Sequence, residues 1–159
     1  MLQIEVEVFR SWAPNGAARF LELANARYYD GARFFRVVPG FVVQFGLAAD
    51  PALNAAWKDK TIPDDPKKES NRRGTLCFAK TAMPGSATTQ IFINLADNAR
   101  LDGMNFTPFG RVIRGMEIVD AIHAGYGQSP DQGRITAEGN AYLQKDFPKL
   151  DFIVSISAN

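Results

Sequence analysis

Residues 34–46 of this chain are FFRVVPGFVVQFG, an apolar run that one arginine and one glutamine interrupt. The valines and phenylalanines on either side of Pro39-Gly40 predict two strands joined by a turn. In one interpretation, Arg36 and Gln44 lie on the solvent face of a half-buried sheet. In the other they line a recognition pocket, because such pockets set a few polar groups on a hydrophobic surface.

The composition is that of an ordinary globular protein of 159 residues. Hydrophobic residues make up 46% of the chain, charged residues make up 22%, and the net charge is +1. These values exclude a disordered or strongly basic chain, so we expect one domain over residues 1–159 and no nucleic-acid partner. No apolar run approaches the length that crosses a bilayer, so we expect no membrane partner either.

The start of the chain has the pattern of a strand. Residues 2–9 alternate apolar and acidic side chains, and they lack the basic start and apolar block of a signal peptide. We therefore favour a soluble, cytoplasmic protein. The alternative is a chain from which a presequence has been removed.

Apolar spacing predicts two main helices. Phe20, Leu21, Leu23 and Ala24 recur at near-helical spacing and predict a helix over residues 17–25, with Pro14 as an early helical residue. Apolar side chains three apart predict a second helix over residues 115–123. A short helical segment is expected around residues 142–143.

Long polar connections separate the remaining elements. Prolines and charges in residues 47–73 predict a surface loop with one helical turn near Ala55 and Trp57, and residues 125–139 predict a Gly-rich connection. Many short strands with few helices favour a mostly antiparallel barrel or sandwich. Besides residues 2–9, the expected strands are 33–37, 41–46, 75–79, 90–94, 109–113 and 152–156.

The chain offers little for conventional catalysis. One histidine, His123, and one cysteine, Cys77, are too few for a zinc site, and no phosphate-binding glycine loop occurs. His123 lies at the end of a predicted helix and is interpreted as a capping or surface group. Leu76 and Phe78 beside Cys77 predict a buried thiol. We expect neither a metal nor a cofactor.

Charged residues gather in the predicted loops. Asp64-Asp65, Asp97 and Asp102 are interpreted as solvated turn residues rather than acid-base pairs. Lys67-Lys68 and Arg72-Arg73 form a basic patch without interleaved aromatic residues. This patch is interpreted as a solvated loop as well.

Three ordered blocks of uncharged polar and aromatic residues resemble the cyclophilin family of peptidyl-prolyl cis-trans isomerases, in a bacterial-type branch. The resemblance implies a mostly β fold: a closed, cyclophilin-like antiparallel β-barrel of seven to eight strands, capped by two helices, plus a short C-terminal helix. The family normally has a strand before residues 2–9, so this form is either trimmed or closes with one strand fewer. The blocks are FFRVVPGFVVQ at 34–44, ATTQIFIN at 87–94, and LDG at 101–103 with FGRV at 109–112, and the match continues through GMEIVD at 115–120.

The resemblance also implies the activity, a peptidyl-prolyl cis-trans isomerase of the EC 5.2.1.8 type. Such an enzyme accelerates rotation about X-Pro bonds and assists protein folding. The implied partners are proline-containing peptides and unfolded or flexible protein segments, and a monomer is expected. The alternative is a non-catalytic adaptor that binds proline peptides in the same groove. Arg36 favours the enzyme, because holding a proline ring does not require a guanidinium.

The family's catalytic residues match Arg36, Phe41 and Gln44 of this chain. The resemblance implies that Arg36 stabilises the twisted amide, that Phe41 lies under the proline ring, and that Gln44 hydrogen-bonds the substrate backbone. Substrate-binding residues are implied in the proline pocket (Val42, Phe92, Leu101), in the groove before the proline (Ala79, Lys80, Gln90) and nearby (Phe35, Arg100, Asn105).

Five of these positions depart from the family pattern, and at one of them Val42 replaces a commoner methionine. Phe35 and Asn105 stand where many members have histidine, and the role of Phe35 stays unassigned. Lys80 replaces a usual asparagine and is expected to add charge at the rim. Arg100 occupies the position of a tryptophan in cyclosporin-sensitive members. Losing that indole removes a flat contact and a hydrogen-bond donor, so we expect weak cyclosporin binding.

Prolyl isomerisation needs no nucleophile, metal or titrating base. Amide resonance sets a barrier of about 18–20 kcal/mol, and only double-bond character must be lost. A guanidinium near the prolyl nitrogen can donate to the lone pair that appears when the amide twists, and this bond favours the transition state over the planar ground state. Arginine suits the task because its planar fork stays charged.

Overall fold

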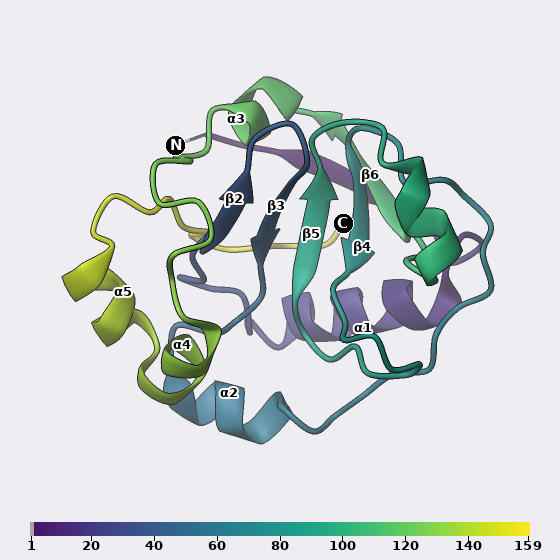
Figure 1. Cartoon of the computed structure of the whole chain (residues 1–159). Helices are drawn as coiled ribbons and strands as arrows, with labels where there is room; N and C mark the ends of the chain where they lie inside the picture. The colour runs from purple at the N-terminus through teal and green to yellow at the C-terminus, as the bar shows by residue number, and fades with distance from the viewer. Residues whose placement is uncertain (1) are drawn as a thin grey trace.

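The computed structural model describes residues 2–159, and these residues form a six-stranded antiparallel sheet (Figure 1). In space the strands follow the order β1, β6, β4, β5, β3, β2. Each strand overlaps a segment in which apolar alternation or an apolar run predicted one. The bounds are β1 Glu5–Val8, β2 Arg36–Val38, β3 Val42–Phe45, β4 Thr75–Phe78, β5 Ile91–Asn94 and β6 Gly110–Arg114.

The two faces of the sheet differ, because successive residues of a strand point to opposite sides. Val37 is paired with Val43, Val43 with Ile93, and Ile93 with Leu76. All four side chains belong to the main hydrophobic core. The residues next to them along each strand therefore point to the other face, which we call the outer face.

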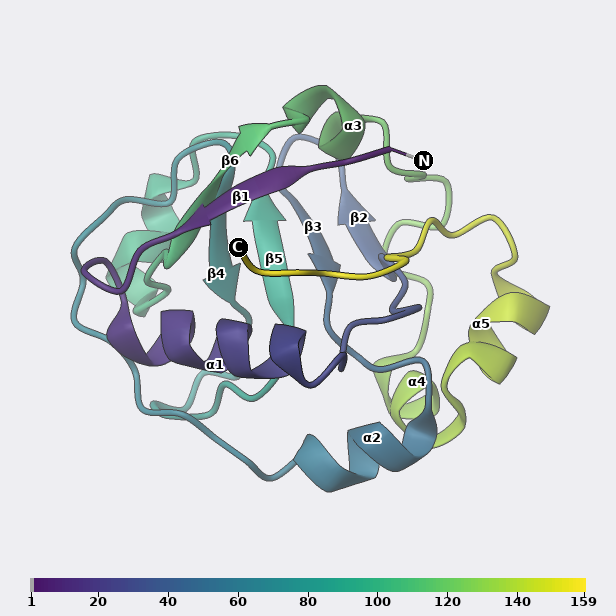
Figure 2. The same cartoon turned by 180° about the vertical axis from the view of Figure 1, so that it is seen from behind.

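Helix α1 (Pro14–Asn25) covers the core face of the sheet (Figure 2). Pro14 lies in its first turn, as predicted, because the N–H that proline lacks would find no helical partner there. Phe20 and Leu23 are buried, and the ring of Phe20 lies 5.2 Å from that of Phe109. This packing fills one side of the sheet and leaves the outer face for a site.

Three short helices gather at one end of the sheet (Figure 1). Helix α2 (Pro51–Trp57) confirms the helical turn expected in the long loop, and Asp50 caps it by accepting the backbone N–H of Ala52. Helix α5 (Asn140–Asp146) confirms the short segment expected around residues 142–143.

Helix α4 (Gln132–Glu138) corrects the prediction of a Gly-rich connection over residues 125–139. The side chain of Asp131 accepts the backbone N–H of Arg134, which is the bond expected of a helix N-cap. Ile135 is buried against the end of the sheet in a second hydrophobic cluster. Capping and burial together stabilise a helix that the Gly-rich, polar composition of residues 125–139 did not predict.

Helix α3 (Met116–Asp120) is shorter than the helix predicted over residues 115–123. Its last turn tightens, because the N–H of Ala121 donates to the carbonyl of Ile118 three residues back. Gly115 precedes the helix at φ +90°, and a Cβ there would lie 2.9 Å from the carbonyl oxygen of Gln3.

Over residues 2–159, every helix is too short or too polar to span a bilayer.

The C-terminal segment also differs from the prediction. Instead of a strand over residues 152–156, the structure has an isolated bridge between Arg33 and Phe152, and the N–H of Gly31 donates to the carbonyl of Ile153 at 2.7 Å. Phe152 is 53% exposed, with its ring over the Arg33 guanidinium. Because pairing stops there, the described residues form six strands rather than seven to eight, and closure of their sheet into a barrel is not found.

Candidate active site

A row of polar side chains crosses the outer face of the sheet. Arg36 is paired with Gln44, and Gln44 with Phe92, so these three side chains project away from α1. Nη1 of Arg36 donates to Oε1 of Gln44 at 3.0 Å, and Nε2 of Gln44 donates to Oε1 of Gln90 at 2.8 Å. We call Arg36, Gln44 and Gln90 the polar row. Gln44 is only 6% exposed and therefore does not lie on a solvent face.

Arg36 is held by neutral groups. Besides Gln44, its partner is Gln128, whose Oε1 accepts a hydrogen bond from Nε at 2.9 Å. No ion pair involves Arg36 among residues 2–159. Burial lowers the pKa of Arg36, but an arginine still stays charged around neutral pH. The positive charge is therefore oriented but not neutralised.

An apolar cluster lies beside the polar row, because Phe92 is the neighbour of Gln44 across the sheet. The 3-10 helix η1 (Ala99–Met104) supplies Leu101 to it. The ring of Phe106 meets that of Phe92 edge-on, with centroids 5.6 Å apart. This apolar cluster consists of the buried Val42, Cys77, Phe92 and Leu101, with the partly buried Phe41, Ala79 and Phe106 packed against them.

Phe41 and Arg100 lie at the rim of the cluster. The guanidinium carbon of the exposed Arg100 is 4.8 Å from the centroid of the Phe41 ring, a cation–π contact. The carbonyl of Phe41 accepts the N–H of Leu95 at 2.8 Å and the side-chain amide of Asn98 at 3.0 Å. These two bonds hold the backbone at Phe41, the residue that carries the ring.

A buried polar network supports the apolar cluster, and the sequence analysis missed it. Asn98 donates to Asn94 at 2.8 Å, Asn94 donates to Asn71 at 3.1 Å, and Asn71 donates to Asp102 at 2.8 Å. We call these four residues the buried network. It joins β5 to η1 and so holds Leu101, the residue before Asp102. The only signals were Asn94 and Asp102, which lie in two of the family-like blocks.

Asp102 is not the solvated turn residue that the sequence predicted. It is 9% exposed, and its carboxylate accepts the Ser70 hydroxyl and the backbone N–H of Asn71. Burial acts to raise the pKa of Asp102, but the hydrogen bonds from Ser70 and Asn71 outweigh it, so the pKa is lowered from its usual value. The charged carboxylate is thus a structural anchor.

Phe35 lies apart from the polar row and the apolar cluster. Its side chain is 1% exposed and belongs to the second hydrophobic cluster. In that cluster it is grouped with Ile135 of α4 and Leu143 of α5. The structure therefore places Phe35 where the short helices meet the sheet, and does not bring it together with the other candidate residues.

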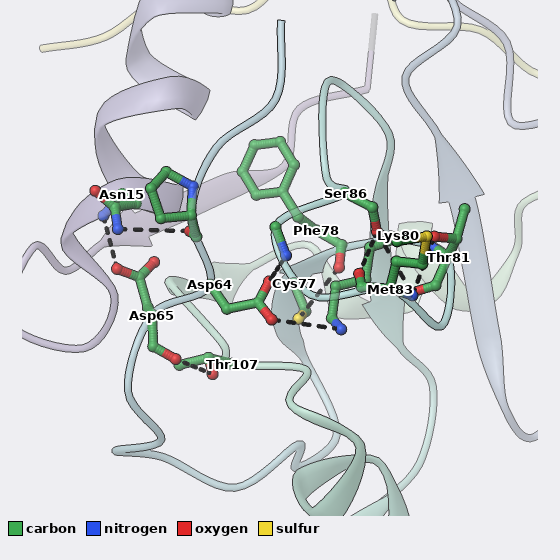
Figure 3. Close-up of polar contacts among 12 residues, drawn as sticks. Asn15, Asp64, Asp65, Cys77, Phe78, Lys80, Thr81, Met83, Ser86 and Thr107 are labelled. Carbon is green, nitrogen blue, oxygen red and sulfur yellow. Dashed lines mark hydrogen bonds and ion pairs between the residues drawn. The ribbon is translucent and has the colours of Figure 1, made fainter. Parts of the chain in front are cut away.

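Lys80 turns inward rather than toward the rim (Figure 3). Its side chain is 6% exposed, with Nζ 3.7 Å from Oδ2 of Asp64 and 5.3 Å from the ring centroid of Phe106. A carboxylate and an aromatic face both attract an ammonium group, which explains this orientation. The charge expected at the rim is therefore paired with Asp64.

A cavity of about 30 Å³ lies next to Lys80, large enough for about one water molecule. Asn105, which ends η1 in the left-handed conformation at φ 64°, lines the cavity together with Lys80 and Cys77. Two of the expected substrate-binding residues, Lys80 and Asn105, thus share this lining. Cys77 is 1% exposed, which confirms the predicted buried thiol, and burial raises its pKa.

Asp65 ties the long loop to helix α1 (Figure 3). Its carboxylate accepts the backbone N–H groups of Asn15 and Gly16, each at 2.9 Å. These amides belong to the first turn of the helix, where N–H groups lack helical partners and a negative charge is favoured. Asp65 is therefore a helix anchor and not a solvated turn residue.

Within residues 2–159, no group of three His, Cys, Asp or Glu side chains could hold a metal ion.

An arginine oriented beside an apolar cluster on an antiparallel sheet agrees with the family that the sequence resembles. The chain belongs to the cyclophilin-type peptidyl-prolyl isomerase family: the model described as "Cyclophilin type peptidyl-prolyl cis-trans isomerase/CLD" matches residues 2–140. The predicted family is thereby confirmed. The fold is accordingly cyclophilin-like, a six-stranded antiparallel sheet with helices.

Bacterial relatives are named peptidyl-prolyl cis-trans isomerases. The chain is 38% identical over 128 residues to "Peptidyl-prolyl cis-trans isomerase" of Acinetobacter baylyi, an alignment that covers 75% of this chain and 65% of the relative. It is 32% identical over 163 residues to "Peptidyl-prolyl cis-trans isomerase B" of Escherichia coli, covering 95% and 90%. The chain thus spans 65%, just under two thirds, of the Acinetobacter relative.

Solved structures show the same fold. A Cryptosporidium parvum cyclophilin-type isomerase, crystallised in the presence of the dipeptide Ala-Pro, matches with a TM-score of 0.64 and 26% identity, over 74% of this chain and 77% of that one. A cyclophilin from Hirschia baltica also matches with a TM-score of 0.64, over 81% and 66%. At 16% identity it supports the fold alone.

Proposed function

We propose that this chain catalyses cis-trans isomerisation of X-Pro peptide bonds in proline-containing peptides and in flexible segments of proteins, and so assists folding. One observation carries the proposal: the Arg36 guanidinium is oriented by neutral amides and not neutralised, beside an apolar cluster on the same face of the sheet. The family to which the chain belongs, and the Ala-Pro dipeptide used with the Cryptosporidium relative, support the choice of bond.

Arg36 is the proposed transition-state donor. When an X-Pro amide twists, the prolyl nitrogen regains a lone pair that resonance withholds in the planar state. A guanidinium N–H aimed at this nitrogen bonds the twisted form more strongly than either planar isomer, which lowers the barrier of about 18–20 kcal/mol. The neighbouring apolar cluster excludes water and strengthens the bond by lowering the local dielectric.

The apolar cluster is the proposed site of the proline ring. Phe41 lies at its edge and Phe92 and Leu101 lie within it, so a ring placed against Phe41 would also meet the other two. Val42 is 2% exposed and contributes from beneath. Holding the ring while the preceding carbonyl rotates confines the motion to the bond that must turn.

Gln44 is the proposed partner of the substrate backbone, and its contacts limit what it can offer. Its oxygen accepts a bond from Arg36, and its amide group donates one N–H to Gln90. An amide group has two N–H donors, so one N–H remains for a substrate carbonyl. Ala79 and Gln90 are the proposed lining of the adjoining groove for the residues before the proline, and the hydrogen bond from the N–H of Ala79 to the carbonyl of Gln90 supports placing them together.

The test is the rate of cis-trans exchange in a short Ala-Pro peptide, measured by exchange NMR with the native chain and with Arg36→Ala. Removing one well-aimed donor to a developing charge typically costs about a hundredfold or more, and we expect that loss for Arg36→Ala. Arg114→Ala is the matched control, because Arg114 is an exposed arginine on β6 with a loose 3.9 Å pair to Glu5.

The outcomes separate the alternatives. No acceleration by the native chain would refute the enzyme, and equal acceleration by the native chain and Arg36→Ala would refute the role of Arg36. Binding of the peptide without exchange would indicate the proline-peptide adaptor. Chemical-shift titration of the same samples measures that binding directly.

Arg100 is expected to weaken cyclosporin binding. Its guanidinium occupies the face of Phe41 and offers no flat indole surface. We expect a dissociation constant above about 100 nM by fluorescence or calorimetric titration, and a gain of about tenfold in Arg100→Trp. Tight binding by the native chain would contradict this expectation.

The remaining features are proposed from the family. We infer that the chain acts as one domain and as a monomer, with the C-terminal segment closing the sheet toward a barrel beside residues 31–34. The hydrogen bonds from Gly31 to Ile153 and from Phe34 to Asp151 support that closure. Slow amide exchange at Gly31 and Phe34, with a monomer mass in sedimentation, is the expected result.

A further inference from the structure

The Arg36 side chain needs more than one contact to hold a fixed direction. A guanidinium is planar, so it is fixed when two different nitrogens are bonded to two fixed acceptors. Gln44 supplies one acceptor at Nη1, and Gln128 supplies the other at Nε, at 3.0 Å and 2.9 Å respectively. The amino nitrogen Nη2 bonds no group among residues 2–159, which leaves it for a ligand.

Gln128 reaches Arg36 from a distant part of the chain. It lies 92 residues further on, in the segment between α3 and α4 that runs beside β2 (Figure 1). The carbonyl of Gly127 accepts the N–H of Val37 at 3.1 Å, which attaches this segment to the strand that carries Arg36. Gly127 itself has φ +54°, a conformation that side chains rarely adopt.

The segment is anchored on its other side as well. The ring of Tyr126 lies 5.1 Å from that of His123 and 5.0 Å from that of Phe147. Its hydroxyl accepts the backbone N–H of Lys149 at 3.3 Å. These contacts fix the residues next to Gln128 even though its own side chain is exposed.

We infer that Gln128 is a positioning residue for the proposed reaction: it fixes the Nε edge of Arg36, so that Nη2 faces the X-Pro bond, without neutralising the guanidinium. A carboxylate at this place would orient Arg36 equally well but would compete for its charge. An amide oxygen orients the group and leaves the charge for the substrate. This inference rests on the proposed function.

The first experiment compares the native chain with Gln128→Leu, which puts an apolar side chain in place of the amide and removes the acceptor. We expect kcat for Ala-Pro exchange to fall roughly tenfold, while the dissociation constant of the peptide stays within about twofold, because only the orientation of the donor changes. Ser129→Ala is the matched control, since Ser129 is exposed on the same segment and its hydroxyl makes no hydrogen bond within residues 2–159.

A second experiment asks whether Gln128 acts through Arg36. Lysine has no Nε–H of the guanidinium kind, so in an Arg36→Lys background the change Gln128→Leu should alter kcat by less than about twofold. If the two substitutions instead multiply their losses, Gln128 affects catalysis by another route and the inference is overturned.

A third measurement is independent of activity. The Nε–H signal of Arg36 in nitrogen-edited NMR should exchange with solvent at least about tenfold faster in Gln128→Leu than in the native chain, because the bonded proton loses its acceptor. If the native chain is inactive, the proposed function fails while this measurement still tests the contact. If the native chain is active and Gln128→Leu retains full kcat, the positioning role is refuted.

Discussion

The polar row and the buried network both border the same apolar cluster, but they differ in how their one charged group is surrounded. Every second residue from Gln90, just before β5, faces outward: Gln90 belongs to the polar row, Phe92 to the apolar cluster and Asn94 to the buried network. The charge of the buried network, on Asp102, is enclosed and bonded by three donors from Ser70 and Asn71. The charge of the polar row is held only by amide oxygens.

This difference separates stability from catalysis within one small site. A carboxylate that accepts several hydrogen bonds in a buried place fixes geometry, and its loss leaves buried donors unpaired. A guanidinium whose partners are neutral remains an unsatisfied electrostatic donor, which costs stability but suits a reaction that develops a lone pair. Changing the charge in each region should therefore affect a different observable.

The largest expected effect is on stability, in Asp102→Asn. The new amide group would face the N–H donors of Asn71, so we expect a loss of about 3 kcal/mol in the free energy of unfolding. Urea denaturation measures it. Asp97→Asn is the control, because Asp97 is exposed and accepts the backbone N–H of Arg73, and it should cost less than about 1 kcal/mol. Equal losses in both variants would contradict the distinction between the two regions.

The next effect is on catalysis, in Gln44→Glu. This substitution places a carboxylate where the polar row has an amide, so the Arg36 charge becomes compensated as in the buried network. We expect kcat for Ala-Pro exchange to fall about tenfold, with stability changed by less than about 1 kcal/mol. Gln44→Leu separates the lost hydrogen bond from the added charge. A native rate in Gln44→Glu would show that an uncompensated charge is unimportant.

The smallest effect is the dependence of stability on pH. The folded-state pKa of Asp102 is lowered, so its charge contributes stability above the unfolded-state pKa of about 4, and this contribution is lost as the pH falls through the folded value. The stability difference between the native chain and Asp102→Asn should therefore shrink as the pH falls from about 6 to about 3. A constant difference in denaturation midpoints would contradict the lowered pKa.

Much of the fold follows from local patterns in the sequence. Pro14 and the spacing of Phe20 and Leu23 predict α1, and apolar alternation predicts β1, because both patterns report which face of an element is buried. Two members of the polar row, Arg36 and Gln44, were also accessible from the sequence. One arginine and one glutamine in an apolar run pair directly across two antiparallel strands, so local spacing alone brings them together.

The buried network could not be predicted in this way. Asn71 and Asp102 lie in segments that look like ordinary polar turns, and only the tertiary fold brings Asp102 against Asn71, 31 residues away in the sequence. Gln128 is a stronger case, since 92 residues separate it from Arg36. The direction of Lys80 likewise depends on Asp64 and Phe106, which the fold places beneath it.

The buried position of Cys77 makes its thiol a probe of local unfolding. Cys77 pairs with Phe92 in the sheet, is 1% exposed, and has a thiol whose pKa is raised by burial, so it can react with an alkylating reagent only while the structure around it is open. The chain has no second cysteine to compete. The alkylation rate therefore reports how often the strands beneath the proposed proline site unfold locally.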